Sequence, residues 1–331
     1  MMHDFRDRSK GSDAVTLMND MGRRSVPFLF VIDFLMENPV VLPLENAEEH
    51  GILYDFNGVT NCPSRTRRIP PARFSKHPVP FAQYLMAYEA VQAHLHRGDS
   101  YLLNLTFPTP IETDLTLEDI FHSSEARYRL LFGRSFVVFS PETFVRIRDG
   151  EISSHPMKGT IDAGRENAEE LILSDPKETA EHTTIVDLIR NDLSAVASHV
   201  GVEKFRYIDR IRTNRGDLLQ VSSRITGRVP DDFSGDIGHI LFNLLPAGSV
   251  TGAPKKKTVE IIRSVETYRR GYYTGVLGCF DGHTLDSGVM IRFIEHTDTG
   301  LVYKSGGGIT VLSNAQDEYQ EMMDKVYVPI V

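Results

Sequence analysis

Amphipathic spacing along the chain predicts four helices. Residues 81–97 repeat apolar positions near a period of 3.6 residues and stop at a glycine. The longest helical pattern covers about 166–197, with a break expected at Pro176. A third helix is expected after Pro254, because proline favours the opening turn of a helix, and a fourth over residues 315–327.

Short apolar runs rich in Val, Ile and Phe predict the strands. Residues 28–34 (FLFVIDF) form a continuous apolar segment that is typical of a buried strand. Two neighbouring runs, 136–140 and 143–148, are expected to form a strand pair. Residues 65–80 are basic and contain four prolines, so an irregular loop is expected there. Other runs predict strands at residues 100–106, 272–280, 289–295 and 301–304. Many strands with a few long helices, not strictly alternating, favour an α+β or layered α/β fold.

The composition is that of an ordinary globular protein and disfavours several classes. The chain has 331 residues, of which 41% are hydrophobic and 24% charged. Its net charge of −9 disfavours nucleic acid as a partner. Cys62 and Cys279 lie far apart, which argues against a disulfide scaffold or a zinc site. No run approaches about 18 apolar residues and no signal-peptide core is present, so we expect a cytoplasmic protein with no membrane partner.

Carboxylates on two predicted helices could serve a metal ion. Glu318, Glu321 and Lys325 are spaced three and four apart, so they share one helix face. The simple interpretation is a solvated face with one Glu321–Lys325 pair, worth about 0.2–0.5 kcal/mol. Glu181 lies beside an apolar row that includes Ile185, where a carboxylate needs a partner, a metal or an edge position. Two such carboxylates, with waters and a substrate oxygen, would suit Mg²⁺.

Two glycine-rich segments could bind an anion or could be simple turns. Residues 248–255 (GSVTGAPK) precede a predicted helix, whose free N–H groups attract anions, although the spacing differs from a Walker A loop. Gly306, Gly307 and Gly308 follow a predicted strand and would let backbone amides approach a ligand. Both interpretations remain open for each segment.

Glu142 and Lys158 would matter together. Glu142 follows Ser-Pro, and Lys158 precedes Gly-Thr sixteen residues later. Neither residue alone indicates a function. If the two side chains lie close together, they would combine a general acid with an amine nucleophile.

In this order, the segments resemble the chorismate-binding enzyme family, which includes anthranilate, aminodeoxychorismate, isochorismate and salicylate synthases. The resemblance covers residues 98–325 and rests on blocks that include GDSYLLNLT, SPETF, PMKGT, KETAEHTTIVDLIRND, LLPAGSVTGAPKKKTVEII, SGGGI and DEYQEMMDKV. It implies two large face-to-face antiparallel sheets flanked by helices, with the site in the cleft between them. We expect residues 98–331 to form the chorismate-binding catalytic region and residues 1–97 to contribute strands to the same domain.

The resemblance gives each candidate residue a role. Glu181 and Glu321 would bind Mg²⁺ against a carboxylate of chorismate, with Glu318 beside the metal. The substrate would be held by Gly159, Thr160, Thr251, Tyr273, Arg292, Gly306, Gly307, Gly308 and Lys325. Glu142 would protonate the departing C4 hydroxyl.

The group that attacks C2 of chorismate separates the family's activities. Isochorismate and salicylate synthases activate water with a lysine where this chain has Leu102, which counts against water chemistry. Lys158 stands where anthranilate synthases usually have alanine, and it matches the proposed nucleophile of aminodeoxychorismate synthases. It must be neutral to attack, so we expect a lowered pKa. The resemblance is therefore closest to aminodeoxychorismate synthase component I, with ammonia from a separate glutamine amidotransferase subunit and a product used for 4-aminobenzoate and folate biosynthesis.

Two alternatives stay open. One is an anthranilate synthase component. Lys158 is the residue that distinguishes this alternative from an aminodeoxychorismate synthase component. The other is a catalytically silent subunit that binds chorismate or serves as a scaffold.

Gln220 departs from the family pattern, because many relatives have a histidine at this position. A glutamine cannot carry a proton at neutral pH. The region before residue 98 is short, so tryptophan regulation is expected to be absent or altered.

Overall fold

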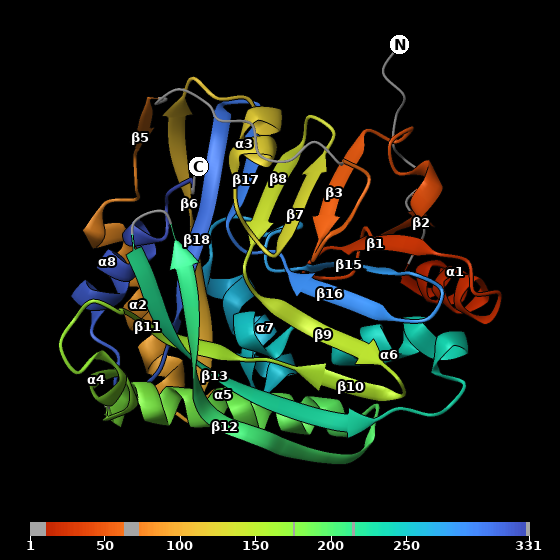
Figure 1. The fold of residues 1–331 in the computed structure, drawn as a ribbon. Coiled ribbons are helices and arrows are strands. Elements are labelled where there is room, and N and C mark those ends of the chain that lie inside the picture. Colours follow the sequence, from red (N-terminus) through yellow and green to blue (C-terminus); the bar gives the residue numbers. More distant parts are fainter. Residues whose placement is uncertain (1–10, 63–72, 175, 214–215, 329–331) are drawn as a thin grey trace.

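Two antiparallel sheets, each of nine strands in the described part of the chain, pack against each other with helices outside (Figure 1). The computed structural model describes residues 11–62, 73–174, 176–213 and 216–328. This architecture confirms the layered fold with two large antiparallel sheets.

The first sheet contains the two longest hairpin strands. Its order is β11 (Met157–Asp162), β13 (Gly216–Arg228), β10 (Glu151–Ser154), β9 (Thr143–Arg148), β16 (Leu285–Val289), β15 (Val276–Phe280), β1 (Phe28–Ile32) and β2 (Val40–Pro43), and β12 (Ser198–Thr213) pairs with β13. The second sheet has the order β14 (Gly252–Ala253), β6 (Leu102–Thr113), β18 (Gly300–Ile309), β17 (Phe293–Thr297), β8 (Phe136–Ser140), β7 (Tyr128–Phe132), β3 (Ile52–Phe56) and β4 (Val59–Thr60), and β5 (Phe74–Lys76) pairs with β6.

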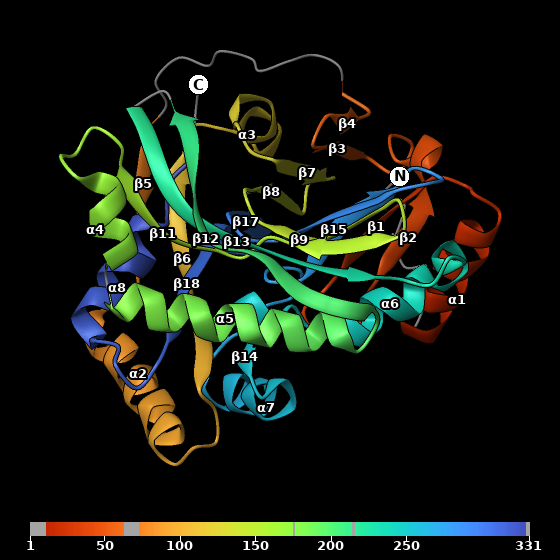
Figure 2. The same cartoon turned by 60° about the horizontal axis from the view of Figure 1, so that its bottom comes forward.

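Helices cover the outer faces of both sheets. The longest, α5 (Pro176–Ser194), runs beneath β12 and β13 (Figure 2). None of the helices in the described ranges has the length and apolar content that crossing a membrane requires. The other helices are α1 (Gly11–Arg23), α2 (Phe81–His96), α3 (Leu117–Ser123), α4 (Ala168–Ser174), α6 (Ile237–Leu244), α7 (Lys255–Val265) and α8 (Ala315–Asp324), with short 3-10 turns at Leu44–Asn46, Phe233–Asp236 and Gly248–Val250.

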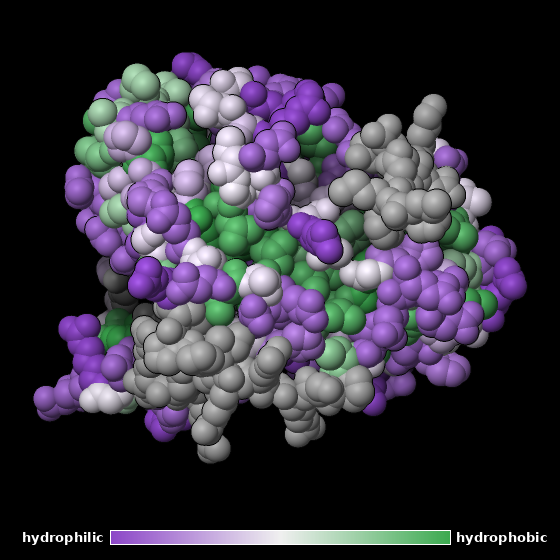
Figure 3. Space-filling model, turned by 90° about the horizontal axis from the view of Figure 1, so that it is seen from above, coloured by the Kyte–Doolittle hydropathy of each residue, from purple (hydrophilic) through white to green (hydrophobic). Residues whose placement is uncertain are grey.

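The core between the sheets is apolar and aromatic. Leu29, Val31 and Leu277 from the first sheet meet Phe136 and Phe293 from the second, and all five are buried. Alternate positions on each strand supply these contacts, as the two-residue period of a strand requires. On the face seen from above, hydrophobic surface lies in the middle and hydrophilic surface surrounds it (Figure 3).

The predicted strand pair 136–140 and 143–148 is correct in its bounds and wrong in its pairing. Strand β8 belongs to the second sheet, between β7 and β17, whereas β9 belongs to the first, between β10 and β16. Both strands already have two neighbours, so the two-residue link crosses from one sheet to the other. Residues 289–295 were predicted as one strand, but β16 ends at residue 289 and β17 begins at residue 293, so 290–292 cross between the sheets too.

The three glycines were predicted to follow a strand, but they lie inside strand β18. Gly306, Gly307 and Gly308 pair with residues 104–106 of β6. A Cβ on Gly306 would lie 2.3 Å from the carbonyl oxygen of Leu105, so glycine is required for this close approach. The strand therefore runs past the predicted end at residue 304.

The remaining predictions agree in part with the structure. The helices over 81–97 and 315–327 are confirmed with small shifts at their ends, and the break at Pro176 separates α4 from α5. The strand predicted at 100–106 continues to Thr113, and that at 272–280 begins only at Val276. In the predicted loop 65–80, residues 63–72 lie outside the described residues and Phe74–Lys76 form a strand.

Candidate active site

A cavity of about 470 Å³ opens between the two sheets, with α5 and α8 at its border. This volume lies in the range of small-molecule sites. Four carboxylates and four cationic side chains line it, so it can receive an anionic substrate without a large excess of either charge. The predicted site residues that line it are Glu142, Lys158, Gly159, Glu181, Tyr273, Arg292, Gly306, Gly307, Gly308, Glu321 and Lys325.

Three of the predicted site residues are not among the described residues that line the cavity. The Thr251 side chain is fully buried and its hydroxyl donates to the carbonyl of Ala247 at 2.8 Å, so it shapes the loop. Glu318 is buried behind Gly307 and accepts a hydrogen bond from Ser313 at 2.8 Å. The backbone of Thr160 lies in β11, and its side chain is outside the described residues.

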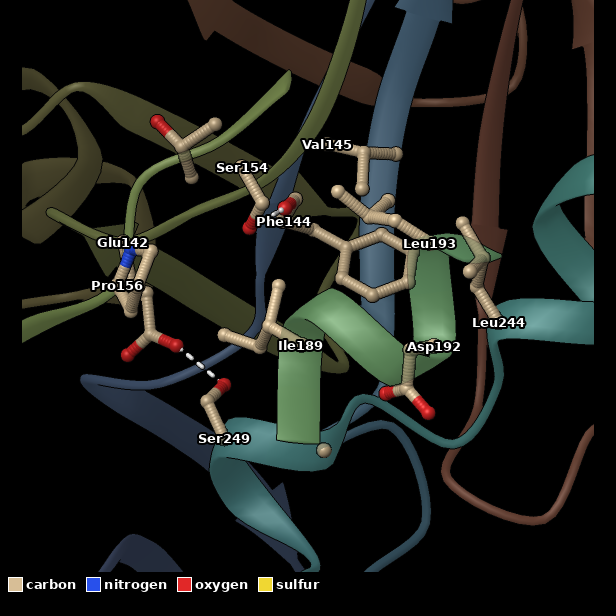
Figure 4. A pocket seen from close by; sticks show the side chains of 12 residues that line it. Glu142, Phe144, Val145, Ser154, Pro156, Ile189, Asp192, Leu193, Leu244 and Ser249 are labelled. Carbon is tan, nitrogen blue, oxygen red and sulfur yellow. Dashed lines mark hydrogen bonds between the residues drawn. The ribbon is translucent and has the colours of Figure 1, made fainter. Parts of the chain in front are cut away.

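Glu142 is held at the point where the chain passes between the sheets. The hydroxyl of Ser249 donates to its Oε1 atom (Figure 4). Burial raises the pKa of Glu142, although Ser249 and the cations Lys325, Arg292 and Lys158 oppose this rise. A carboxyl with a raised pKa keeps its proton at higher pH, which a general acid requires.

Lys158 forms an ion pair with Glu181 across the cavity wall. The distance from Nζ to Oε2 is 2.6 Å. Burial alone would favour the neutral amine, but Glu181, together with Glu321 and Glu178, outweighs it and raises the pKa of Lys158. The expectation of a lowered pKa is therefore wrong for this arrangement, in which Glu181 holds the lysine as an ammonium.

Lys158 lies at an irregularity in the edge strand β11. The register against β13 shifts between residues 158 and 160, and Gly159 has a φ of 75°. A bulge of this kind redirects a side chain, and here it brings Lys158 toward α5. His182, next to Glu181 on that helix, is buried and bonded to Ser223 of β13 at 2.7 Å, which fixes the helix against the same sheet.

Lys325, which caps the C-terminal end of α8, forms the predicted pair with Glu321 of that helix, with Nζ and Oε1 2.7 Å apart. The same ammonium donates to the carbonyl of Gly306 at 2.8 Å. Burial lowers the pKa of Lys325, although Glu321 opposes this change. The pair therefore sits directly beside the glycines of β18.

Arg292 occupies the second crossing between the sheets. Its φ of 53° lies in the left-handed region, which costs a non-glycine residue about 1–3 kcal/mol. The surrounding strands hold this conformation, because the carbonyl of Arg292 accepts from the amide of Phe139 at 3.1 Å. Tyr273, which also lines the cavity, is buried, and burial raises its pKa, so its hydroxyl remains a donor.

Residues 43–330 match the family described as chorismate binding enzyme. The chain belongs to this family. The family match begins before residue 98, so it is longer than the region of motif resemblance. In this chorismate-binding chain, the four residues Glu142, Lys158, Glu181 and Glu321 face one cavity, as the resemblance requires.

Relatives cover this chorismate-binding chain to different extents. It is 53% identical over 312 residues to a Haemophilus influenzae protein named an uncharacterized PabA-like protein, an alignment that covers 94% of this chain and 95% of that protein. It is 34% identical over 261 residues to aminodeoxychorismate synthase component 1 of Salmonella typhimurium, with 74% of this chain and 56% of that protein covered. The crystal structure of anthranilate synthase component I from Streptococcus pneumoniae TIGR4 superposes with a TM-score of 0.64 at 27% identity and covers 78% of this chain and 59% of that one. The chain thus spans little more than half the length of these two synthase components.

Ser249 and Lys304 are among the polar side chains of the cavity that sequence reasoning missed. Ser249 reaches Glu142, although the sequence indicated only that its loop could bind an anion. Lys304 is buried, pairs with Glu295 at 2.8 Å and donates to the carbonyl of Arg270 at 2.9 Å. A lysine inside an apolar strand pattern was the signal that could have identified it.

The carboxylates suit a magnesium ion in their chemistry. Glu181 and Glu321 offer the hard oxygen ligands that Mg²⁺ prefers, and this ion commonly uses only one or two protein carboxylates. Within the described ranges, no three acidic, histidine or cysteine side chains form a ready-made metal cluster. The two lysine ammonium groups balance these carboxylates instead. The residues therefore fit a metal that substrate oxygens would help to hold.

Proposed function

We propose that this chain is component I of aminodeoxychorismate synthase, which converts chorismate and ammonia to 4-amino-4-deoxychorismate. The observation that carries the proposal is that Lys158 and Glu142 line the same cavity. The similarity to a named aminodeoxychorismate synthase component supports it. Ammonia would come from a separate glutamine amidotransferase subunit, and the product would serve 4-aminobenzoate and folate biosynthesis.

The proposed first half of the reaction uses the acid and the lysine. The neutral amine of Lys158 forms a bond to C2, the ring double bonds shift, and the C4–O bond breaks. Glu142 gives its proton to the departing hydroxyl, which leaves as water. The lysine must first lose the proton that Glu181 now stabilises, so substrate binding has to rearrange the Lys158–Glu181 pair.

The second half restores the ring and the enzyme. Ammonia forms a bond to C4, the double bonds shift back, and the C2–Nζ bond breaks to release the lysine as a neutral amine. The new ammonium group loses one proton to Glu142, which is then ready for another turnover. Arg292, Lys325 and the hydroxyl of Tyr273 would bind the substrate's oxygens throughout.

Glu181 and Glu321 are proposed to hold Mg²⁺, which would supply positive charge to a substrate carboxylate and to the electrons displaced from the ring. Removal of divalent ions with a chelator should abolish turnover, and added Mg²⁺ should restore it.

An anthranilate synthase component is the second candidate. The observation that favours it is the raised pKa of Lys158, since a lysine held as an ammonium cannot attack C2 and would leave that position to ammonia. The solved anthranilate synthase component is also similar over most of this chain.

The test is incubation with chorismate, Mg²⁺ and ammonium, followed by mass analysis of the product with and without an aminodeoxychorismate lyase. We expect 4-amino-4-deoxychorismate, which the lyase converts to 4-aminobenzoate. Lys158→Ala should remove at least 99% of this activity, given the usual size of nucleophilic contributions. Anthranilate as the wild-type product would overturn the proposal, and so would no turnover at all, which would point to a silent binding subunit.

A further inference from the structure

An ion pair joins the end of the loop that carries Ser249 to helix α5. Lys255, the first residue of α7, places Nζ 2.8 Å from Oδ2 of Asp192 and 2.6 Å from the carbonyl oxygen of Leu244. Both side chains of the pair are only 19% exposed. Solvent therefore screens this pair less than it screens an ordinary surface pair.

The loop 247–254 passes very close to its neighbours at both ends. A Cβ on Gly248 would lie 3.0 Å from Oδ2 of Asp192, so the loop touches α5 directly beside the ion pair. At the other end Gly252 pairs with Leu103 of β6 and has a φ of 127°. A Cβ there would meet the carbonyl oxygen of Leu102 at 1.8 Å. Ser249 lies between these two attachments.

Side-chain packing leaves a gap behind the loop. A narrow cavity of about 20 Å³ lies between Glu142 and Asp192, with Phe144, Ile189 and Leu193 among its walls (Figure 4). This is room for about one water molecule. On one side of Ser249 the carbonyls of Val250 and Thr251 accept hydrogen bonds from Arg270 and Asn104, both at 2.9 Å. On the other side, where the gap lies, the loop passes the ion pair at Gly248.

We propose that the Asp192–Lys255 pair is a positioning device that holds the loop so that Ser249 donates to Glu142. This inference rests on the proposed role of Glu142 as the proton donor. The pair touches neither the cavity nor its substrate, so it acts through Ser249. The other charged groups that face Glu142 are Lys325, Arg292 and Lys158, and none of them belongs to the loop.

Lys255→Met should release the loop and take Ser249 away from Glu142. The bond from Ser249 favours the ionised carboxylate, so its loss raises the pKa of Glu142. The basic limb of the kcat profile should then move up by about one pH unit, the size expected for one hydrogen bond to a charged group. We expect kcat at the pH optimum to fall on the order of tenfold, with KM for chorismate changed less than twofold.

Three further variants separate positioning from general damage. Ser249→Ala should produce the same shift of the basic limb while the ion pair is intact, and adding Lys255→Met to it should shift the limb no further. Lys255→Arg, which keeps a donor for Asp192, should restore the wild-type profile. Lys257→Met is the matched control, because Lys257 lies on the same helix and pairs only with Glu260 at the surface among the described contacts.

Hydrogen exchange of the loop tests the same proposal without turnover. Amides of residues 248–252 should exchange at least tenfold faster in Lys255→Met than in the wild type and in Lys257→Met. Unchanged exchange together with an unchanged pH profile would overturn the proposal, as would additive shifts in the double variant. If the wild-type chain turned over no chorismate, the proposed function would fail, and the exchange rates alone would still decide whether Lys255 holds the loop.

Discussion

At the residue scale, neighbouring groups give the cavity's carboxylates different chemistry. Glu142 has a hydroxyl and three more distant cations around it, and burial raises its pKa. Glu181 and Glu321 instead form ion pairs with lysine ammonium groups, at 2.6 and 2.7 Å. The division into one acid and two anions therefore follows from what each carboxylate touches.

Glu142→Gln should remove the acid and leave the shape of the site intact. We expect kcat to fall by about 10²–10⁴, the usual contribution of a general acid, with a smaller effect on KM. Wild-type kcat should decline as pH rises through the raised pKa of Glu142, and the residual activity of the variant should lack that limb. A steady-state pH profile measures both, and a variant with wild-type kcat would refute the assignment.

The same substitution should affect folding in the opposite direction. A carboxyl whose folded pKa is raised above the ordinary 4.5 contributes most stability below pH 4.5 and loses it as pH rises through the folded value. Glutamine does not titrate, so the variant does not lose stability in this way as pH rises. Glu142→Gln should therefore unfold at a higher denaturant concentration than the wild type at neutral pH, and this advantage should shrink toward pH 4.5.

The sequence contained the identities of the site residues but not their protonation. Lys158 illustrates this limit, since its motif suggested a neutral nucleophile. Its charge depends on the 2.6 Å contact with Glu181, which is 23 residues away in the chain and on a different element. Motif order could bring the two residues to one site, whereas only their spatial arrangement sets a pKa.

At the element scale, the local periodicity of helices was more informative than that of strands. Helices α2, α7 and α8 begin where they were predicted to begin, and the predicted ends of α2 and α8 are one and three residues too late. Each helix exposes one face and buries the other, which gives the periodic pattern that located it. Strand bounds were often found, but strand partners were not. The link at Pro141 looked like a hairpin turn, yet both flanking strands take other neighbours. Pairing depends on distant strands, which local alternation does not reveal.

Substitution of a glycine in β18 tests whether the close approach of β18 to β6 requires glycine. Gly306→Ala would place a methyl group 2.3 Å from the backbone of β6, so we expect a loss of about 2–4 kcal/mol in the free energy of unfolding and loss of activity. Chemical denaturation measures the first effect. Gly201→Ala is the control, because its added Cβ meets no heavy atom within 4 Å, and equal destabilisation of the two variants would contradict this account.

At the scale of the whole molecule, the site exists because the sheets pack against each other. The aromatic core holds them at a fixed separation, and the two chain crossings bring Glu142 and Arg292 into the space between them. The sequence indicated each wall of the cavity through its motifs. It could not indicate that residues 140–143 and 289–293 change sheets, because the first link looks like a hairpin turn and the second like part of one apolar strand.

Phe293→Ala should loosen this packing. The ring is fully buried and stacks on Phe136 with 4.9 Å between centroids, so its removal should cost about 3–5 kcal/mol of unfolding free energy. Activity should fall more than the folded fraction explains, since Arg292 is the preceding residue. Denaturation curves and kcat of the folded enzyme measure the two effects. An exposed aromatic, Phe74→Ala, is the control and should change stability by less than 1 kcal/mol.

The irregular end of β11 has an evolutionary consequence. Within the described residues this strand pairs only with β13, so position 158 lies on an edge strand at the border of the cavity. Under the proposed mechanism, exchange of Lys158 for alanine would replace the amine by a methyl group and transfer the attack on the ring from the protein to free ammonia. Related enzymes could therefore diverge in product while the scaffold stays the same.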